Sequence, residues 1–243
     1  MPIERVQTTF FQDPLWAESL ADLVLPEQLE RARAARLFRV WAPACGMGEE
    51  LYSVSVLLAQ ALPDGDDWSI FLTGTDTDDA RLNRARRAAY AEGALRAFTR
   101  EERACYFRYN PNTRRYGLRE RYIRNAHFGY RTLVDVTSAA PTPGSFELIL
   151  CPDSVSALPV SEQRAVFGYF TQVLSERGVV VARKQIEGVE TMHRAFHAGL
   201  VAHHKGSVSQ PVSTLPSSER PTARPPAPSS DWSRALSNER SVA

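Results

Sequence analysis

The chain contains little cysteine and no long apolar segment. Its 243 residues include three cysteines, Cys45, Cys105 and Cys151, which are far apart and form no Cys-x-x-Cys pair. This spacing suits a reducing compartment better than a disulfide framework. The lack of a signal peptide and of any run of about 18 or more apolar residues predicts a cytoplasmic protein with no membrane insertion. A net charge of only +1 gives no general case for a nucleic acid or a membrane surface as partner.

The amino-acid composition changes near residue 206. Hydrophobic residues make up 43% of the sequence and charged residues 23%, which is typical of a globular protein with room for one α/β domain and an appendage. From residue 206 onward, proline, serine and threonine are frequent and apolar residues are few. Such a segment buries too little apolar surface to fold, so we expect a disordered tail over residues 206–243.

The most informative stretch is a short apolar strand that leads into a small-residue loop and then a helix. Phe38–Trp41 precedes the loop Ala44–Gly48, and the acidic pair 49–50 opens an amphipathic helix. Glycines in such a loop let the backbone approach a ligand closely. The loop does not match G-x-G-x-x-G and has no P-loop lysine, which argues against a pyrophosphate ligand. The pattern favours an S-adenosylmethionine (SAM) methyltransferase, with a purely structural strand–helix turn as the alternative.

A second apolar strand supports a nucleoside ligand. Trp68–Gly74 is followed by Asp76. In Rossmann-like folds an acidic residue at the end of the second strand holds a ribose diol, because a carboxylate accepts hydrogen bonds from both hydroxyls. We therefore predict that Asp76 binds ribose.

Five segments carry a resemblance to a known family. They are Thr8-Thr9-Phe10-Phe11-Gln12-Asp13, Ala44-Cys45-Gly46-Met47-Gly48-Glu49-Glu50-Leu51-Tyr52-Ser53, Thr75-Asp76-Thr77-Asp78, Ala89-Tyr90 and Phe146-Glu147-Leu148-Ile149-Leu150-Cys151. In order and spacing these segments resemble the CheR-type chemotaxis receptor methyltransferases, from about residue 6 to about residue 188. The resemblance implies an α/β fold: a Rossmann-like SAM-methyltransferase sheet with helices on both faces and a small antiparallel β-subdomain. It also implies S-adenosyl-L-methionine as the cofactor.

The resemblance gives a domain organisation. We expect an extended and helical lead-in over residues 1–36 and a SAM-methyltransferase-like domain over 37–205. Within that domain we expect the β-subdomain as an insertion over 99–131, and the disordered tail follows over 206–243. We expect no counterpart of the family's helical N-terminal domain.

Candidate site residues follow from the matching positions. The expected cofactor-binding residues are Thr8, Ala44, Gly46, Glu49, Asp76, Thr132 and Leu133. Among these, Ala44 replaces a family glycine, and Thr132 replaces the asparagine of an Asn-Leu pair that contacts the adenosyl group. Gln12 and Ala157 occupy the positions of the family's arginine and tyrosine, which face the methyl-transfer centre. No metal ligand is expected.

Several replacements fall where the chemistry would occur. Pro152-Asp153 replaces an Arg-Asn pair, and residues 182–185 replace Gly-His-Ser-Glu. Gln12 cannot form the bidentate charged pair that an arginine forms with a carboxylate, Ala157 has no hydroxyl, and Asp153 should repel an approaching glutamate. We predict a methyltransferase for chemoreceptor glutamate side chains whose transfer is weak or absent. The alternative is a degenerate module that binds a receptor or signalling partner without methyl transfer.

Residues 105–125 are basic and aromatic and predict a strand–turn–strand unit. By the resemblance, this hairpin would bind a chemoreceptor or a related signalling protein by strand addition. Alternating arginines and tyrosines also suit RNA, which we do not favour, and a hairpin without a partner is a further alternative.

Apolar periodicity predicts the remaining elements. We expect helices over 14–36, 50–61, 79–90 and 161–174, a capping box at Thr99 and Glu102, and strands over 146–151 and 178–182. Residues 188–200 predict either a last helix or a strand pair. On a helix, His193 and His197 would lie one turn apart, which is a weak metal-site pattern and more often an ordinary surface helix.

Overall fold

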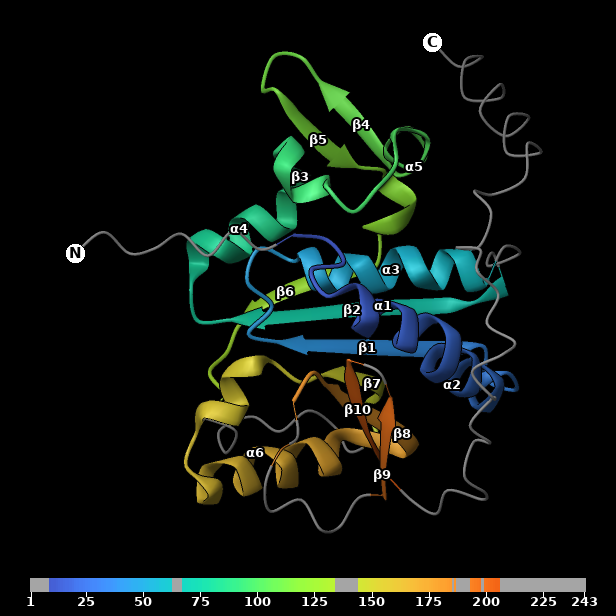
Figure 1. Ribbon diagram of the computed structural model, residues 1–243, viewed down its shortest axis with the longest axis vertical. Helices are drawn as coiled ribbons and strands as arrows, with labels where there is room; N and C mark the ends of the chain where they lie inside the picture. Colours follow the sequence, from blue (N-terminus) through green and yellow to red (C-terminus); the bar gives the residue numbers. More distant parts are fainter. Residues whose placement is uncertain are drawn as a thin grey trace.

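A computed structural model describes residues 9–62, 67–133, 144–184, 186, 193–197 and 199–205, the range 193–197 by its backbone alone. Thr8 and the tail 206–243, for which we made predictions, lie outside these residues. Within them, a central sheet has helices on both faces, and a small second sheet projects from one side (Figure 1). No helix in these ranges is long and apolar enough to cross a membrane.

The central sheet is mostly parallel. Its strands are β1 (Leu37–Pro43), β2 (Ser69–Asp76), β6 (Ala126–Tyr130), β7 (Phe146–Leu150), β8 (Leu174–Ala182), β9 (His193–His197) and β10 (Leu200–His204). The strand order is β6-β2-β1-β7-β8-β10-β9. The first five strands in this order pair in parallel, while β10 is antiparallel to both of its neighbours. The predicted Rossmann-like α/β fold is therefore confirmed.

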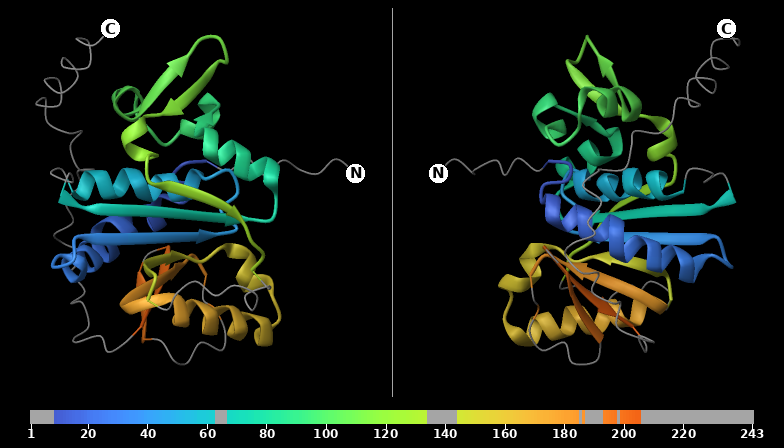
Figure 2. Two further views of the ribbon diagram at one scale, coloured as in Figure 1. Left: turned by 180° about the vertical axis from the view of Figure 1, so that it is seen from behind. Right: turned by 45° about the vertical axis from the view of Figure 1, so that its right-hand side comes forward.

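Helices cover both faces of this sheet (Figure 2). They are α1 (Pro14–Ser19), α2 (Leu25–Ala32), α3 (Glu49–Ala61), α4 (Asp79–Arg87) and α6 (Val160–Val173), whereas α5 (Arg100–Tyr106) lies beside the small sheet. Successive strand residues alternate between two cores, because side chains on a strand point to opposite faces. Val40 and Leu148 pack in the core that contains residues of α1, α2 and α3. Trp41 and Ile149 pack in the core that contains the aromatic residues of α6.

The predicted helix over 14–36 is interrupted by a π-helical turn at Leu20–Val24. The amide of Leu25 donates to the carbonyl of Leu20, and Pro26 follows in the first turn of α2. Proline has no N–H and its ring clashes with the carbonyl four residues earlier, so a wider turn before Pro26 relieves this conflict. The helical segment ends at Ala32, and residues 33–36 form an exposed turn; Trp16 and Leu29, among others, pack the helical part in the core.

The small sheet is separate from the central one and stands above it in Figure 1. It consists of β3 (Ala89–Tyr90), β4 (Phe107–Asn110) and β5 (Arg115–Leu118), paired antiparallel in the order β3-β5-β4. The predicted antiparallel subdomain is thus confirmed, and Thr99 and Glu102 form the predicted capping box of α5. Residues 126–130, at the end of the range 99–131, form β6 of the central sheet.

Two predictions about single elements were wrong or left open. The helix expected over 79–90 ends at Arg87, because Ala88 adopts a left-handed φ of 45° and the chain then pairs with β5. The last segment forms the strand pair β9 and β10 and not a helix. His193 and His197 therefore lie on a strand, where four residues span about 13 Å and not one helical turn.

Candidate active site

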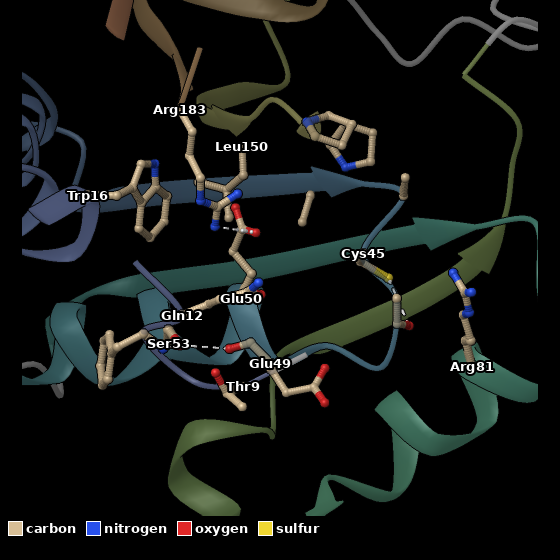
Figure 3. A pocket seen from close by; sticks show the side chains of 16 residues that line it. Thr9, Gln12, Trp16, Cys45, Glu49, Glu50, Ser53, Arg81, Leu150 and Arg183 are labelled. Carbon is tan, nitrogen blue, oxygen red and sulfur yellow. Dashed lines mark hydrogen bonds and ion pairs between the residues drawn. The ribbon is translucent and has the colours of Figure 1, made fainter. Parts of the chain in front are cut away.

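A cavity of about 150 Å³ lies at the carboxyl ends of β1, β7 and β8 (Figure 3). Strand β1 is followed in sequence by β2 on one side, whereas β7 pairs with its other side, so the chain changes direction here. Open parallel sheets bind ligands at such a point. The residues around the cavity include Thr9, Gln12, Trp16, Ala44, Cys45, Gly46, Glu49, Glu50, Ser53, Arg81, Leu150, Pro152 and Arg183.

The loop between β1 and α3 forms one end of the cavity. Ala44, Gly46 and Gly48 have left-handed φ values of 51°, 58° and 88°. A Cβ atom placed on Gly46 would meet no other atom within 4 Å, so the space beside this residue is open to a ligand. A Cβ atom on Gly48 would lie 3.2 Å from the Ala85 Cβ of α4 and from the Tyr52 ring of α3, so these helices leave little room for a side chain. The loop thus presents bare backbone to the cavity.

Asp76, at the end of β2, holds this loop from behind. Its Oδ2 atom accepts a hydrogen bond from the Gly46 amide at 2.8 Å, and its Oδ1 atom accepts one from the Asp78 amide at 3.0 Å. The residue is 5% exposed and is not among the residues that line the cavity. Each carboxylate oxygen has a second lone pair, so these two bonds leave acceptor capacity for a ligand hydroxyl.

The lead-in segment is tied to α3 at the floor of the cavity. The Ser53 hydroxyl donates to the Glu49 carbonyl at 2.7 Å and accepts from the Phe11 amide at 3.1 Å. Glu49 lines the cavity and is 2% exposed. Next to it, the buried Thr9 hydroxyl has no hydrogen-bond partner among the described residues. Because an unsatisfied buried hydroxyl is costly, Thr9 is a natural partner for a polar ligand group.

The opposite end of the cavity contains a partly buried guanidinium. Arg183 follows β8, and its Nη2 atom donates to Glu50 Oε2 at 2.9 Å (Figure 3). Its Nη1 atom lies 3.6 Å from Asp153 Oδ1, and its Cζ atom lies 5.0 Å from the centre of the Trp16 ring. Burial raises the pKa of the Glu50 carboxyl, although the Arg183 charge acts in the other direction. Burial acts to lower the pKa of Arg183, but the carboxylates of Glu50, Asp153 and Asp13 together raise it, so the guanidinium stays charged.

The structure brings some of the expected site residues together. Gln12, Ala44, Gly46 and Glu49 line the cavity, along with Pro152. The other candidates that it describes stand outside the lining. Thr132 and Leu133 follow β6, and Ala157 is exposed at the end of the 3₁₀ turn Asp153–Ala157.

One element of the sequence argument needs correction. The charge of Asp153 is not isolated, since Arg183 lies 3.6 Å away and compensates it. The sequence comparison marked Arg183 only as a departure from a family histidine. A signal for its role was present in the sequence. Arg183 adds a positive charge directly after the strand predicted at 178–182, and Asp153 adds a negative charge shortly after the strand predicted at 146–151.

A family model described as the CheR methyltransferase, SAM binding domain matches residues 6–197. The chain belongs to the CheR methyltransferase family. It is 30% identical to a probable chemotaxis protein methyltransferase of Rhizobium etli, over 70% of this chain and 63% of that protein. It is 25% identical to the chemotaxis protein methyltransferase of Escherichia coli, over 72% of this chain and 58% of that protein. The chain spans about three fifths of the length of these relatives.

Among solved structures, magnesium protoporphyrin IX methyltransferase from Synechocystis PCC 6803 with bound SAM is similar, with a TM-score of 0.43 and 16% identity over 82% of this chain and 86% of that one. The cofactor of this CheR domain is S-adenosyl-L-methionine. Two observations fit it. The open space beside Gly46 admits a ligand against the backbone, and the buried Thr9 hydroxyl offers a partner to a polar group. SAM carries no phosphate, in agreement with a loop that lacks a phosphate-binding lysine.

Proposed function

We propose that this CheR-family protein transfers the methyl group of SAM to glutamate side chains of a chemotaxis receptor. The observation that carries the proposal is a cavity lined both by the loop at Gly46, where no side chain fills the space, and by a partly buried cation, Arg183. The first feature suits the cofactor and the second suits an anionic acceptor. We place the protein in the cytoplasm, where such receptor domains are accessible.

The expected cofactor contacts follow the order of the strands. We expect Asp76 to accept the ribose hydroxyls and Glu49 to face the methionyl end together with Thr9. Thr132 and Leu133, which follow the edge strand β6, would contact the adenine. Thr8, the remaining expected residue, precedes the described chain. This assignment keeps the cofactor on the β1–β2–β6 side of the cavity.

The chemistry requires little from the protein beyond placement. SAM supplies a methyl group on a positively charged sulfur. A glutamate side chain, with an ordinary pKa near 4.3, is already ionised at neutral pH, so no general base is needed. The contribution of this chain is to orient the carboxylate and to exclude water, for which Trp16 and Leu150 form apolar walls. Missing acid–base groups therefore do not by themselves rule out turnover.

A second candidate function is a CheR-like module that binds a receptor or signalling partner without methyl transfer. The observation that favours it is the replacement of the family's arginine and tyrosine by Gln12 and Ala157. We expect loss of both orienting groups to slow transfer by about 10²- to 10⁴-fold, comparable to the cost of misplacing reacting groups in other enzymes. In both functions, the partner would bind at the hairpin of β4 and β5.

The test is transfer of radiolabelled methyl from SAM to chemoreceptor-containing membranes. Wild-type protein should give slow, measurable labelling. The double variant Gln12→Arg/Ala157→Tyr should label about 10²- to 10⁴-fold faster, because it restores a guanidinium and a hydroxyl. Arg33→Gln, a charge change at an exposed residue after α2 and outside the cavity lining, is the control and should match wild type.

Two results would contradict this reasoning. Fast wild-type labelling that the double variant does not change would show that positions 12 and 157 do not limit transfer. No labelling by either protein, with SAM bound, would favour the module without methyl transfer.

A further inference from the structure

We propose that Arg183 binds the carboxylate of the methyl-accepting side chain. This inference rests on the proposed function and names the group that recognises its substrate. Two arginines line the cavity among the residues that the structure describes, Arg81 and Arg183. Arg81 is exposed on α4 and pairs with Asp78 at 3.4 Å. Arg183 has a side chain that is 17% exposed and reaches into the cavity.

The register of the sheet explains how a guanidinium reaches this place. Leu150 of β7 pairs with Val181 of β8, and the Cys151 amide donates to the Val181 carbonyl at 2.8 Å. Continuing this register places Pro152 beside Arg183 at adjacent strand ends. The residues at positions 12 and 152 are uncharged, so Arg183 brings positive charge to this end of the cavity from the neighbouring strand.

The order of the strands separates Arg183 from the cofactor side. Asp76 ends β2, Gly46 follows β1, Pro152 follows β7 and Arg183 follows β8. Neighbouring strands are about 4.8 Å apart, so about 14 Å separates the ends of β2 and β8. A cofactor with its ribose at Asp76 and its methionyl part along the loop would point its reactive end toward β7 and β8. Arg183 is therefore placed for the acceptor.

The present contacts of Arg183 leave room for a carboxylate. A guanidinium has five N–H donors, and Glu50 takes one of them at 2.9 Å. Asp153 lies 3.6 Å away, which is longer than a hydrogen bond, and its side chain is 51% exposed. An incoming carboxylate can thus replace Asp153, while Glu50 and the Trp16 ring keep the guanidinium in place. Asp153 neutralises Arg183 until the acceptor arrives.

This placement also discriminates substrate from product. One carboxylate oxygen of the acceptor is held by Arg183, and the other forms the new bond to the methyl carbon. The carbon–sulfur bond breaks, its electron pair stays on sulfur, and no proton moves. The product is a neutral methyl ester, which accepts a weaker hydrogen bond from Arg183 than a carboxylate does. Arg183 therefore favours the unmethylated side chain and releases the ester.

The experiment measures carboxylate recognition apart from turnover. Soluble chemoreceptor fragments from the same genome, with either glutamate or glutamine at the methylation positions, are titrated into protein saturated with S-adenosylhomocysteine. Wild type should bind the glutamate form about 10- to 150-fold more tightly, as expected for a hydrogen bond to a charged group. Arg183→Gln should abolish this preference, and Arg183→Lys should retain part of it. Arg33→Gln, the matched change at an exposed arginine outside the cavity lining, should keep it, and Asp153→Asn should increase it.

The outcomes separate this inference from the proposed function. An unchanged preference for glutamate in Arg183→Gln overturns the assignment. If Arg183→Gln also binds S-adenosylhomocysteine more weakly, Arg183 would instead hold the carboxylate of the cofactor itself. If wild type transfers methyl groups but does not prefer glutamate over glutamine, the assignment of Arg183 is wrong and the proposed function stands. If wild type prefers glutamate but transfers no methyl group, the proposed function is wrong and the assignment stands. If it does neither, both are wrong. Thermal melting of each variant verifies that it is folded.

Discussion

The two ends of the cavity differ in what defines them, backbone conformation at one end and side-chain charge at the other. The loop end, Ala44–Gly48 with Asp76 behind it, is defined by backbone: left-handed φ values and an amide held by a carboxylate. The strand end, Pro152 and Asp153 after β7 with Arg183 after β8, is defined by side-chain charge. The loop end keeps most of the sequence pattern of the CheR family, with Ala44 in place of a glycine, whereas the strand end does not.

This difference has a physical reason. A backbone conformation can be produced only by the residues of that segment, so the loop tolerates few replacements. A positive charge can reach the same point from any neighbouring strand end that is long enough. Pro152 stands where the resemblance gives an arginine, but the cavity still contains a cation at this end, because Arg183 lines it. Counting replaced residues overstates the loss of function unless the neighbours are considered.

The largest effect that would sharpen this comparison concerns Cys45, at the loop end. Burial, followed by the charges of Asp76 and Glu49, raises the pKa of the Cys45 thiol from 9.0 to about 12. Alkylation requires the thiolate, so iodoacetamide should modify Cys45 in the folded protein about 10³-fold more slowly than in the unfolded chain. The folded-state rate should keep rising tenfold per pH unit above pH 9, whereas the unfolded rate levels off.

Mass spectrometry of the Cys45 peptide measures this rate, and Asp76→Asn is the matched variant, in which alkylation should be faster. For the same reason, the contribution of Cys45 to the free energy of unfolding decreases as the pH rises from 9.0 toward about 12. The folded chain keeps a proton that the unfolded chain releases. A folded-state rate that levels off near pH 9 would show that the loop end is more polar than its geometry indicates.

The next prediction tests whether the loop end binds the cofactor independently of the strand end. Asp76→Ala removes both the support of the Gly46 amide and the expected ribose acceptor. We expect the affinity for S-adenosylhomocysteine to fall by about 1.5–3 kcal/mol, which is about 10- to 150-fold. Calorimetric titration measures this change. The preference for glutamate over glutamine, assigned to Arg183, should persist at saturating ligand.

Asp79→Ala, which removes an exposed carboxylate at the start of α4, is the control and should leave the affinity unchanged. Equal affinities of wild type and Asp76→Ala would remove Asp76 from the cofactor site. A loss of the glutamate preference in Asp76→Ala would show that the two ends are not independent.

Local sequence patterns predicted most of the fold. Short apolar runs predicted β1, β2, β7 and β8, and Thr99 with Glu102 predicted the start of α5. The pattern could not reveal that α4 ends at Arg87, because that end depends on pairing of Ala89–Tyr90 with β5, which is distant in sequence. The π-helical turn before Pro26 was likewise hidden, although the proline itself was a signal.

The same division applies to the candidate site. Glycine spacing and the acid after the second strand drew attention to the loop end, because that end depends on local conformation. Arg183 could not be placed, because its position relative to Glu50 and Asp153 depends on the pairing of β7 with β8. A side-chain pair 133 residues apart in sequence leaves no local pattern.

The smallest predicted effect tests whether the backbone of the loop end is strained. Ala44 occupies a left-handed conformation with a φ of 51°, which costs an alanine about 1–2 kcal/mol and a glycine almost nothing. Ala44→Gly regains this energy but loses about 0.4–1 kcal/mol to the greater freedom of the unfolded chain. We therefore expect a net stabilisation of about 0.5–1 kcal/mol, seen in urea denaturation as a higher midpoint with an unchanged slope. Gly48→Ala, at a φ of 88° and with a neighbour at 3.2 Å, should instead be destabilised. If Ala44→Gly lost stability, residue 44 would not hold the left-handed conformation in solution, and the loop end would not owe its shape to its backbone.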